Sequence, residues 1–224
     1  MVILATKVYV EGEAKRRSLD SLESLVANGL ADLDAEFTLG LRDDGFPSVT
    51  LTGEDAPAAR SLLAEEWGAI TPHREAGETY VGTLESWDDD GIVLDAGENV
   101  RIPTDELGLG QGSPAQIRKR FGLVQHMPLR FVEGEDGEPA RLADEERDRL
   151  YEWTRGTERV NVNSATRAEV RATVNRSGHA QDIVTVERLG LLEQSIICRE
   201  ETDAPGLLSD IGPHLQAELL AVVP

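Results

Sequence analysis

The sequence contains a single cysteine, no long apolar run and few aromatic residues. Cys198 cannot form an intramolecular disulfide, and a metal site built from several thiolates is excluded. It stands in an apolar run, where a small buried side chain is expected rather than a reactive thiol. No segment approaches the roughly 18 consecutive apolar residues of a membrane span, and the N-terminus lacks the features of a signal peptide. We therefore expect a soluble cytoplasmic protein.

Positive charge is also scarce. Acidic residues number 42 against 22 basic ones, the lysines are Lys7, Lys15 and Lys119, and the formal net charge is -20. Carboxylates spread over the whole chain, with arginine in place of lysine, are typical of proteins adapted to very high salt, because carboxylates retain water and cations. At about 1 M salt the Debye length is only about 3 Å, so this charge neither establishes nor excludes a nucleic-acid partner.

Hydrophobic periodicity divides the chain into three segments, residues 1–72, 73–143 and 144–224. The first segment is predicted to have the order βαββα. Its expected elements are strands at 2–10, 36–41 and 48–52 and helices at 13–33 and 55–67, the latter capped by Asp55. The last segment is predicted to be a helix followed by βαββαβ. Its expected elements are helices at 144–155, 166–177 and 205–215 and strands at 159–162, 182–189, 195–199 and 219–223. The predicted fold class is α+β, with two ferredoxin-like sandwiches flanking a central domain.

The central segment is predicted to be a five-stranded barrel. Its expected strands are residues 79–86, 91–95, 100–103, 127–132 and 139–142. The strong helix signal lies between the third and fourth strands, where Ser113 is a helix cap and Pro114 is the first helical residue. An OB fold, which often binds single-stranded nucleic acid, has its helix in this place. An OB-like barrel is therefore expected.

Residues 82–84, 91–95 and 97–103 resemble the opening of the RNA-binding barrel family named after the largest protein of the bacterial small ribosomal subunit. The resemblance implies an RNA ligand. In that family, aromatic side chains on and before the second strand stack on bases, but Asp90 and Val93 occupy the matching positions. Trp87 and Tyr80 could partly replace them, or they could pack at the rim of the barrel.

A glycine-rich loop leads into the predicted central helix. Such a loop leaves backbone N–H groups free to hold an anion such as phosphate, although no nucleotide P-loop sequence follows. The candidate phosphate or RNA contacts are Gly108, Gly110, Gly112, Ser113, Arg118, Lys119, Arg120, Phe121, Gln125, His126 and Arg130. An ordinary solvated helix face with ion pairs would have the same sequence.

An alternative ligand site lies near the C-terminus, at Asp203, Ala204, Pro205 and Gly206. This stretch is similar to the signature of amino-acid-binding ACT regulatory domains, which implies a small-ligand sensor. In that family the motif precedes the first helix of the unit, whereas here it precedes the second. A plain capped helix is the other interpretation.

Catalytic patterns are lacking. The histidines are far apart in the sequence, and none has a metal-ligand partner at a spacing of three or four. Carboxylates are too abundant to single out a catalytic pair. We therefore predict no enzyme activity, no cofactor and no metal site.

Taken whole, the chain resembles the archaeal domain-of-unknown-function family DUF2110, which is found in haloarchaea. The resemblance rests on residues 28–30, 43–49, 108–131, 186–192 and 202–208. We expect a non-catalytic, RNA-associated protein of the translation or RNA-processing machinery, whose partner is RNA or a ribonucleoprotein. The alternative is a small-ligand sensor or protein-interaction adaptor that acts through the C-terminal domain.

Overall fold

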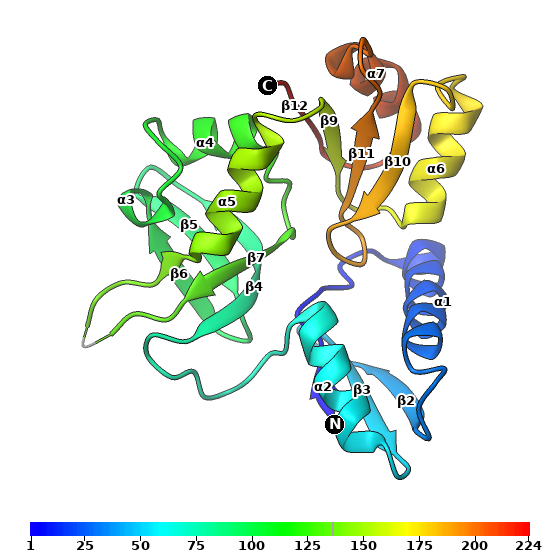
Figure 1. Cartoon of the computed structure of the whole chain (residues 1–224), viewed down its shortest axis with the longest axis vertical. Helices are drawn as coiled ribbons and strands as arrows, with labels where there is room; N and C mark the ends of the chain where they lie inside the picture. Colours follow the sequence, from blue (N-terminus) through cyan, green and yellow to red (C-terminus); the bar gives the residue numbers. More distant parts are fainter. Residues whose placement is uncertain (136) are drawn as a thin grey trace.

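The computed structural model describes residues 1–135 and 137–224. The fold is mixed α+β, with three antiparallel sheets of three, five and four strands in chain order. The N-terminal and C-terminal sheets follow each other along the long axis of the molecule, and the five-stranded sheet lies beside both (Figure 1). The confirmed part of the predicted fold is this α+β architecture with a central five-stranded sheet.

The N-terminal sheet has the strand order β1-β3-β2. Its strands are β1 (Val2–Ile3), β2 (Glu36–Leu41) and β3 (Pro47–Thr52), and its helices are α1 (Gly12–Gly29) and α2 (Ala56–Trp67). Leu22 and Val26 of α1 and Leu63 of α2 are buried in the core of this part. Apolar spacing predicted α1, which ends four residues earlier than expected, whereas α2 was predicted from Asp55 and Pro57 at its start.

Two expectations for this part are wrong. The predicted strand over residues 2–10 is paired only at Val2–Ile3, and Leu4 adds an isolated bridge to Ala69. Beyond it the polar side chains of Lys7 and Tyr9 bond to residues far along the chain, so the segment leaves the sheet. The side chain of Asp55 stands at the start of α2 but does not cap it, because it accepts the backbone N–H of Asp34 at 2.8 Å.

The central sheet has the strand order β6-β5-β4-β7-β8 and curls into a half-barrel. Its strands are β4 (Thr79–Trp87), β5 (Gly91–Asp95), β6 (Asn99–Pro103), β7 (Pro128–Val132) and β8 (Arg141–Leu142). Helix α4 (Pro114–Phe121) lies between the third and fourth of these strands, as predicted. Ser113 and Gln116 close a reciprocal capping box at its start. A short helix α3 (Thr104–Leu107), which the sequence did not predict, precedes the glycine-rich loop.

Helix α5 (Asp144–Trp153) follows the half-barrel. The sequence pattern groups this helix with the C-terminal segment. In the structure, Leu150 and Trp153 of α5 lie in the same core as Phe121 and Phe131 of the half-barrel. Helix α5 therefore completes the packing of the central part.

The C-terminal sheet has the strand order β10-β11-β9-β12. Its strands are β9 (Arg159–Val162), β10 (Ile183–Arg188), β11 (Gln194–Cys198) and β12 (Leu219–Val222), and its helices are α6 (Arg167–Arg176) and α7 (Ala204–Ile211). The last helix is shorter than predicted, since a 3-10 turn at Gly212–His214 follows it. Cys198 is buried, as expected.

The three parts share their cores. Leu191 and Leu192, between β10 and β11, pack into the N-terminal core, and Val222 of β12 packs into the half-barrel core. Within the described part of the chain, no helix combines the length and the apolar character that crossing a membrane requires.

Candidate nucleic-acid interface

The glycine-rich loop between α3 and α4 is held by its carbonyl groups. Arg120 of α4 donates to the carbonyl oxygens of Leu109, at 3.3 Å, and Gln111, at 2.8 Å. The hydroxyl of Tyr151 in α5 donates to the carbonyl oxygen of Gly108 at 3.2 Å. Gly108 has a φ of 63°, a conformation that glycine adopts without strain. Three peptides of the loop thus turn their carbonyls toward α4 and α5.

The N–H groups of the same peptides point the other way. In a trans peptide the C=O and the following N–H lie on opposite sides, so the N–H groups of Leu109, Gly110 and Gly112 face away from Arg120 and Tyr151. Among the described residues these three groups have no acceptor. A hollow of about 460 Å³ lies beside Gly110 and Gly112, lined by Thr104, Asp105, Gly108, Gly110, Gln111 and Gly112. Leu109 is buried and does not line it. Several free N–H groups in one loop suit an anion.

Basic side chains surround this loop. Arg147, Tyr151 and Arg155 are spaced by four residues along and just beyond α5, so they share one face. The side chain of Arg147 fills the space beside Gly108, where an added Cβ would lie 2.6 Å from its Cδ. The guanidinium of Arg155 lies 5.4 Å from the ring centroid of Tyr151. Two carboxylates oppose this charge: Asp144 pairs with Arg147, and Asp105 lines the hollow beside the loop.

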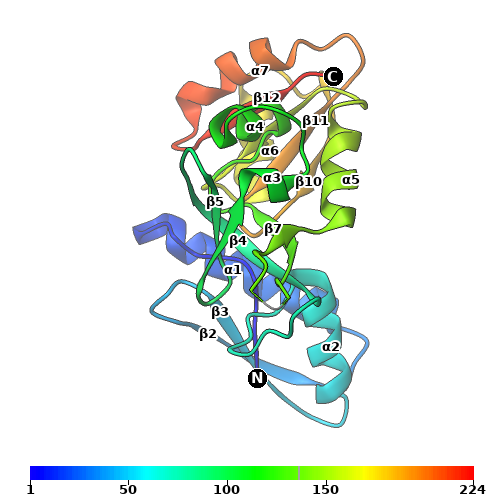
Figure 2. The same cartoon turned by 90° about the vertical axis from the view of Figure 1, so that its left-hand side faces the viewer.

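Sequence reasoning named Arg120 and Lys119 but missed Arg147, Tyr151 and Arg155. Lys119 is exposed on α4 and has no ion pair within the described ranges. The four-residue spacing of the other three was visible in the sequence and could have indicated them. Helices α3 and α4 face the viewer in Figure 2, with α5 beside them.

Two predicted contacts, Arg118 and Phe121, are buried instead. Arg118 lies with Nη1 2.7 Å from Glu218 Oε1 and 3.0 Å from the carbonyl oxygen of Leu123. Its guanidinium covers the ring of Trp87, 3.8 Å from the centroid, which favours the rim-packing interpretation of Trp87. Neither Arg118 nor Phe121 can reach a ligand on this surface without leaving the core.

The other predicted residues lie elsewhere. Gln125 lies at the junction with the C-terminal part, where its backbone N–H donates to Glu218 at 2.9 Å, and its side-chain amide donates to the carbonyl oxygen of Glu85 at 2.8 Å. The His126 ring lies 3.9 Å from the Tyr9 ring, and burial lowers the pKa of His126 although Glu85 opposes this. Arg130 is on β7, beside Glu146. The structure therefore gathers only the loop residues, Ser113, Lys119 and Arg120 of the predicted set.

Three family models match consecutive parts of the chain. The DUF2110 N-terminal domain matches residues 1–73, the DUF2110 central domain matches residues 74–154, and the DUF2110 C-terminal domain matches residues 157–223. The chain belongs to the DUF2110 family. No curated protein matches it. Because the DUF2110 central domain includes α5, the glycine-rich loop and the Arg147–Tyr151 face lie in one domain.

In the DUF2110 C-terminal domain, the alternative site forms the start of α7. The N–H of Ala204 donates to the carboxylate of Glu158 at 2.8 Å, and the Asp203 side chain makes no cap bond. A hollow of about 310 Å³ adjoins this turn and is lined by His179, Asp182, Glu201, Thr202, Asp203, Gly206, Leu207 and Asp210. Its lining is acidic. A ligand site at residues 203–206 stays a prediction.

His179 in this hollow is expected to titrate above its ordinary range. Its Nδ1 lies 2.7 Å from Asp182 and its Nε2 lies 3.0 Å from Asp210, and the hydrogen bond to Asp182 is the main cause that raises the pKa of His179 above 6.5. An NMR titration should show the Asp182→Asn variant with a lower midpoint than the parent. Asp20→Asn, on α1, is the matched control and should not move it. A parental midpoint below 6.5 would contradict the assigned hydrogen bonds.

Proposed function

We propose that this DUF2110 protein is a non-catalytic, RNA-associated protein of the translation or RNA-processing machinery. The RNA backbone would lie on the glycine-rich loop between α3 and α4. The observation that carries the proposal is the pair of N–H groups at Gly110 and Gly112, which have no acceptor among the described residues and lie beside the hollow of the loop. A phosphate could accept from these N–H groups, while neighbouring phosphates of the same RNA backbone could reach the exposed cations Lys119 and Arg155.

We also propose a fold type for each domain: an OB-like barrel for the central domain and ferredoxin-like folds for the two outer domains. The strand order β6-β5-β4-β7-β8, with α4 between its third and fourth strands, supports an OB-like barrel. The order β12-β9-β11-β10, with a helix after its first and third strands in the chain, supports a ferredoxin-like C-terminal domain. The N-terminal order β1-β3-β2 fits the same type with its fourth strand reduced to the bridge at Ala69.

The negative net charge of the chain determines how its affinity for RNA should depend on salt. With a net charge of -20, long-range forces repel RNA at low salt, and at about 1 M salt they are screened within about 3 Å. We also propose an archaeal, halophilic host. At the salt concentration inside such a cell, only close contacts between protein and RNA would decide the affinity. We therefore expect the affinity for RNA to persist or rise as salt increases, opposite to the usual loss through counterion release.

The test is the affinity for single-stranded RNA in molar KCl, measured by fluorescence anisotropy. The double variant Lys119→Ala/Arg155→Ala removes two exposed cations and leaves Arg120, which holds the loop, in place. We expect it to weaken binding about tenfold or more, since each charge-assisted contact contributes about 1.5 kcal/mol or more. Arg167→Ala/Arg171→Ala on α6 is the control with the same change of charge. Equal losses in both double variants, or no loss in the first, would contradict the site.

Ultraviolet crosslinking in cells grown at native salt identifies the RNA. Crosslinked peptides within residues 104–122 or 147–155 would agree with the proposed face. A protein that carries no RNA under these conditions would contradict an RNA-associated function.

A further inference from the structure

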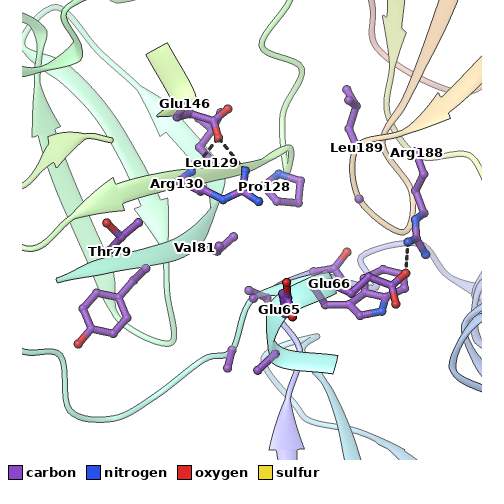
Figure 3. Close-up of a pocket in the computed structure, with 18 of the residues that line it drawn as sticks. Glu65, Glu66, Thr79, Val81, Pro128, Leu129, Arg130, Glu146, Arg188 and Leu189 are labelled. Carbon is purple, nitrogen blue, oxygen red and sulfur yellow. Dashed lines mark hydrogen bonds and ion pairs between the residues drawn. The ribbon is translucent and has the colours of Figure 1, made fainter. Parts of the chain in front are cut away.

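A cavity of about 470 Å³ lies where the three domains meet (Figure 3). It is bounded by the end of α2, by β4 and β7 of the half-barrel, and by the turn after β10. Its lining includes Thr6, Glu66, Trp67, Thr79, Val81, Leu129, Arg130, Glu146, Arg149, Arg188 and Leu189. Cavities of this size between domains are common places for small ligands. It is separate from the glycine-rich loop, because Glu146 and Arg149 lie on a different face of α5 from Arg147 and Tyr151.

The half-barrel wall of the cavity has two arginines against one carboxylate, whereas the α2 wall contributes Glu65 and Glu66. Glu146 is fully buried, and its carboxylate forms ion pairs with both Arg149 and Arg130. Arg149 holds it closely, with Nε 3.0 Å from Oε1. Arg130 Nη1 remains 3.7 Å from Oε2, which is too far for a hydrogen bond. The Arg130 guanidinium therefore keeps donors for another acceptor, and Figure 3 shows it pointing into the space between β7 and the turn after β10.

The opposite wall also has unused donors. Arg188 pairs with Glu66 and lies over the Trp67 ring, 4.1 Å from its centroid. Arg188 Nη1 and Trp67 Nε1 are buried, and neither has an acceptor within the described part of the chain. Trp67 is only 7% exposed. These two nitrogens have almost no accessible surface, so a ligand in the cavity would meet Arg188 through its other atoms.

We infer that this cavity binds a small anionic molecule that carries a carboxylate or phosphate group. The anionic group is held by Arg130, and the apolar part lies against Val81, Leu129 and Leu189. The inference goes beyond the RNA proposal and does not depend on it. Because the lining comes from all three domains, binding stabilises their mutual arrangement.

Thermal unfolding with three probes tests the inference: inorganic phosphate, adenosine 5′-monophosphate and succinate, each in molar KCl. At a hundred times Kd, a bound probe should raise the unfolding midpoint by about 5–10 °C. Phosphate or the nucleotide acting alone would assign a phosphate group, whereas succinate acting alone would assign a carboxylate. If none of the three raises the midpoint, the inference is overturned.

Two variants decide whether a raised midpoint comes from this cavity. Arg130→Gln removes the available guanidinium and should weaken the active probe at least tenfold by calorimetry. Thr79→Trp, at an exposed position of the lining, should block the cavity without changing its charge and should abolish the effect even if Arg130→Gln folds poorly. Arg141→Gln on β8 is the control for charge, and the Lys119→Ala/Arg155→Ala variant should keep the effect. Unchanged binding in both cavity variants would place the probe elsewhere and overturn the inference.

Discussion

Replacing Glu193 by glutamine is expected to stabilise the protein by about 4 kcal/mol at pH 8 and hardly at all near pH 4.5. Glu193 lies between β10 and β11 and is fully buried. Its Oε1 accepts the Tyr9 hydroxyl at 2.6 Å, and its Oε2 has no partner among the described residues. Burial is the main cause that raises the pKa of Glu193 to about 8, against the opposing hydrogen bond from Tyr9.

The sign follows from proton binding in the two states. An unfolded chain releases this proton near pH 4.5, whereas the folded protein retains it up to about pH 8. Between these values the folded state binds more protons, so its stability falls by about 1.4 kcal/mol per pH unit. Glutamine has no such proton and mimics the neutral acid. The advantage of Glu193→Gln should therefore grow from pH 4.5 to pH 8 and remain constant above.

Urea unfolding of both proteins across this pH range measures the effect. Glu23→Gln, at an exposed position of α1, is the control and should show no comparable trend. A difference that is independent of pH, or a loss of stability that grows with pH, would contradict the neutral buried acid. The expected trend would also mean that the folded protein loses stability in alkaline solution, because Glu193 then becomes a buried charge.

Elements with local causes could be predicted from the sequence. The apolar spacing in α1, the Ser113–Gln116 cap of α4 and the turn between β2 and β3 all act within a few residues. Their positions agree with the structure to within a few residues. The positions of the central strands and of α4 along the chain followed in the same way, since each strand pattern was separate.

Features that depend on distant partners could not be predicted. Residues 5–10 have a strand-like composition, but Lys7 bonds to Glu85 and Tyr9 bonds to Glu193, so tertiary contacts override local preference. Arg118, Lys119 and Arg120 are equivalent in the sequence. Contacts with residues outside α4 give the three side chains separate roles. Arg118 forms a buried ion pair, Lys119 is an exposed cation, and Arg120 supports the glycine-rich loop. The cavity between the domains has no local signal at all.

Arg118→Met provides a direct test of that division, with an expected loss of about 2–4 kcal/mol in the free energy of unfolding. The variant removes the charge that compensates Glu218, which also accepts the backbone N–H of Gln125 at 2.9 Å. It also removes the hydrogen bond to Leu123 and the contact with Trp87. Breaking a fully buried ion pair costs about 3–5 kcal/mol, and the partial exposure of Glu218 reduces this.

Urea unfolding of Arg118→Met, Lys119→Met and the double variant Arg118→Met/Glu218→Gln separates the effects. Lys119→Met should change stability by no more than about 0.5 kcal/mol, because Lys119 is exposed on the same helix. Glu218→Gln should recover part of the loss caused by Arg118→Met, since it removes the uncompensated carboxylate. RNA affinity, measured where both variants are folded, should fall for Lys119→Met and stay unchanged for Arg118→Met. The reverse pattern would mean that Arg118 leaves the core to meet the RNA, as its place in the basic run first indicated.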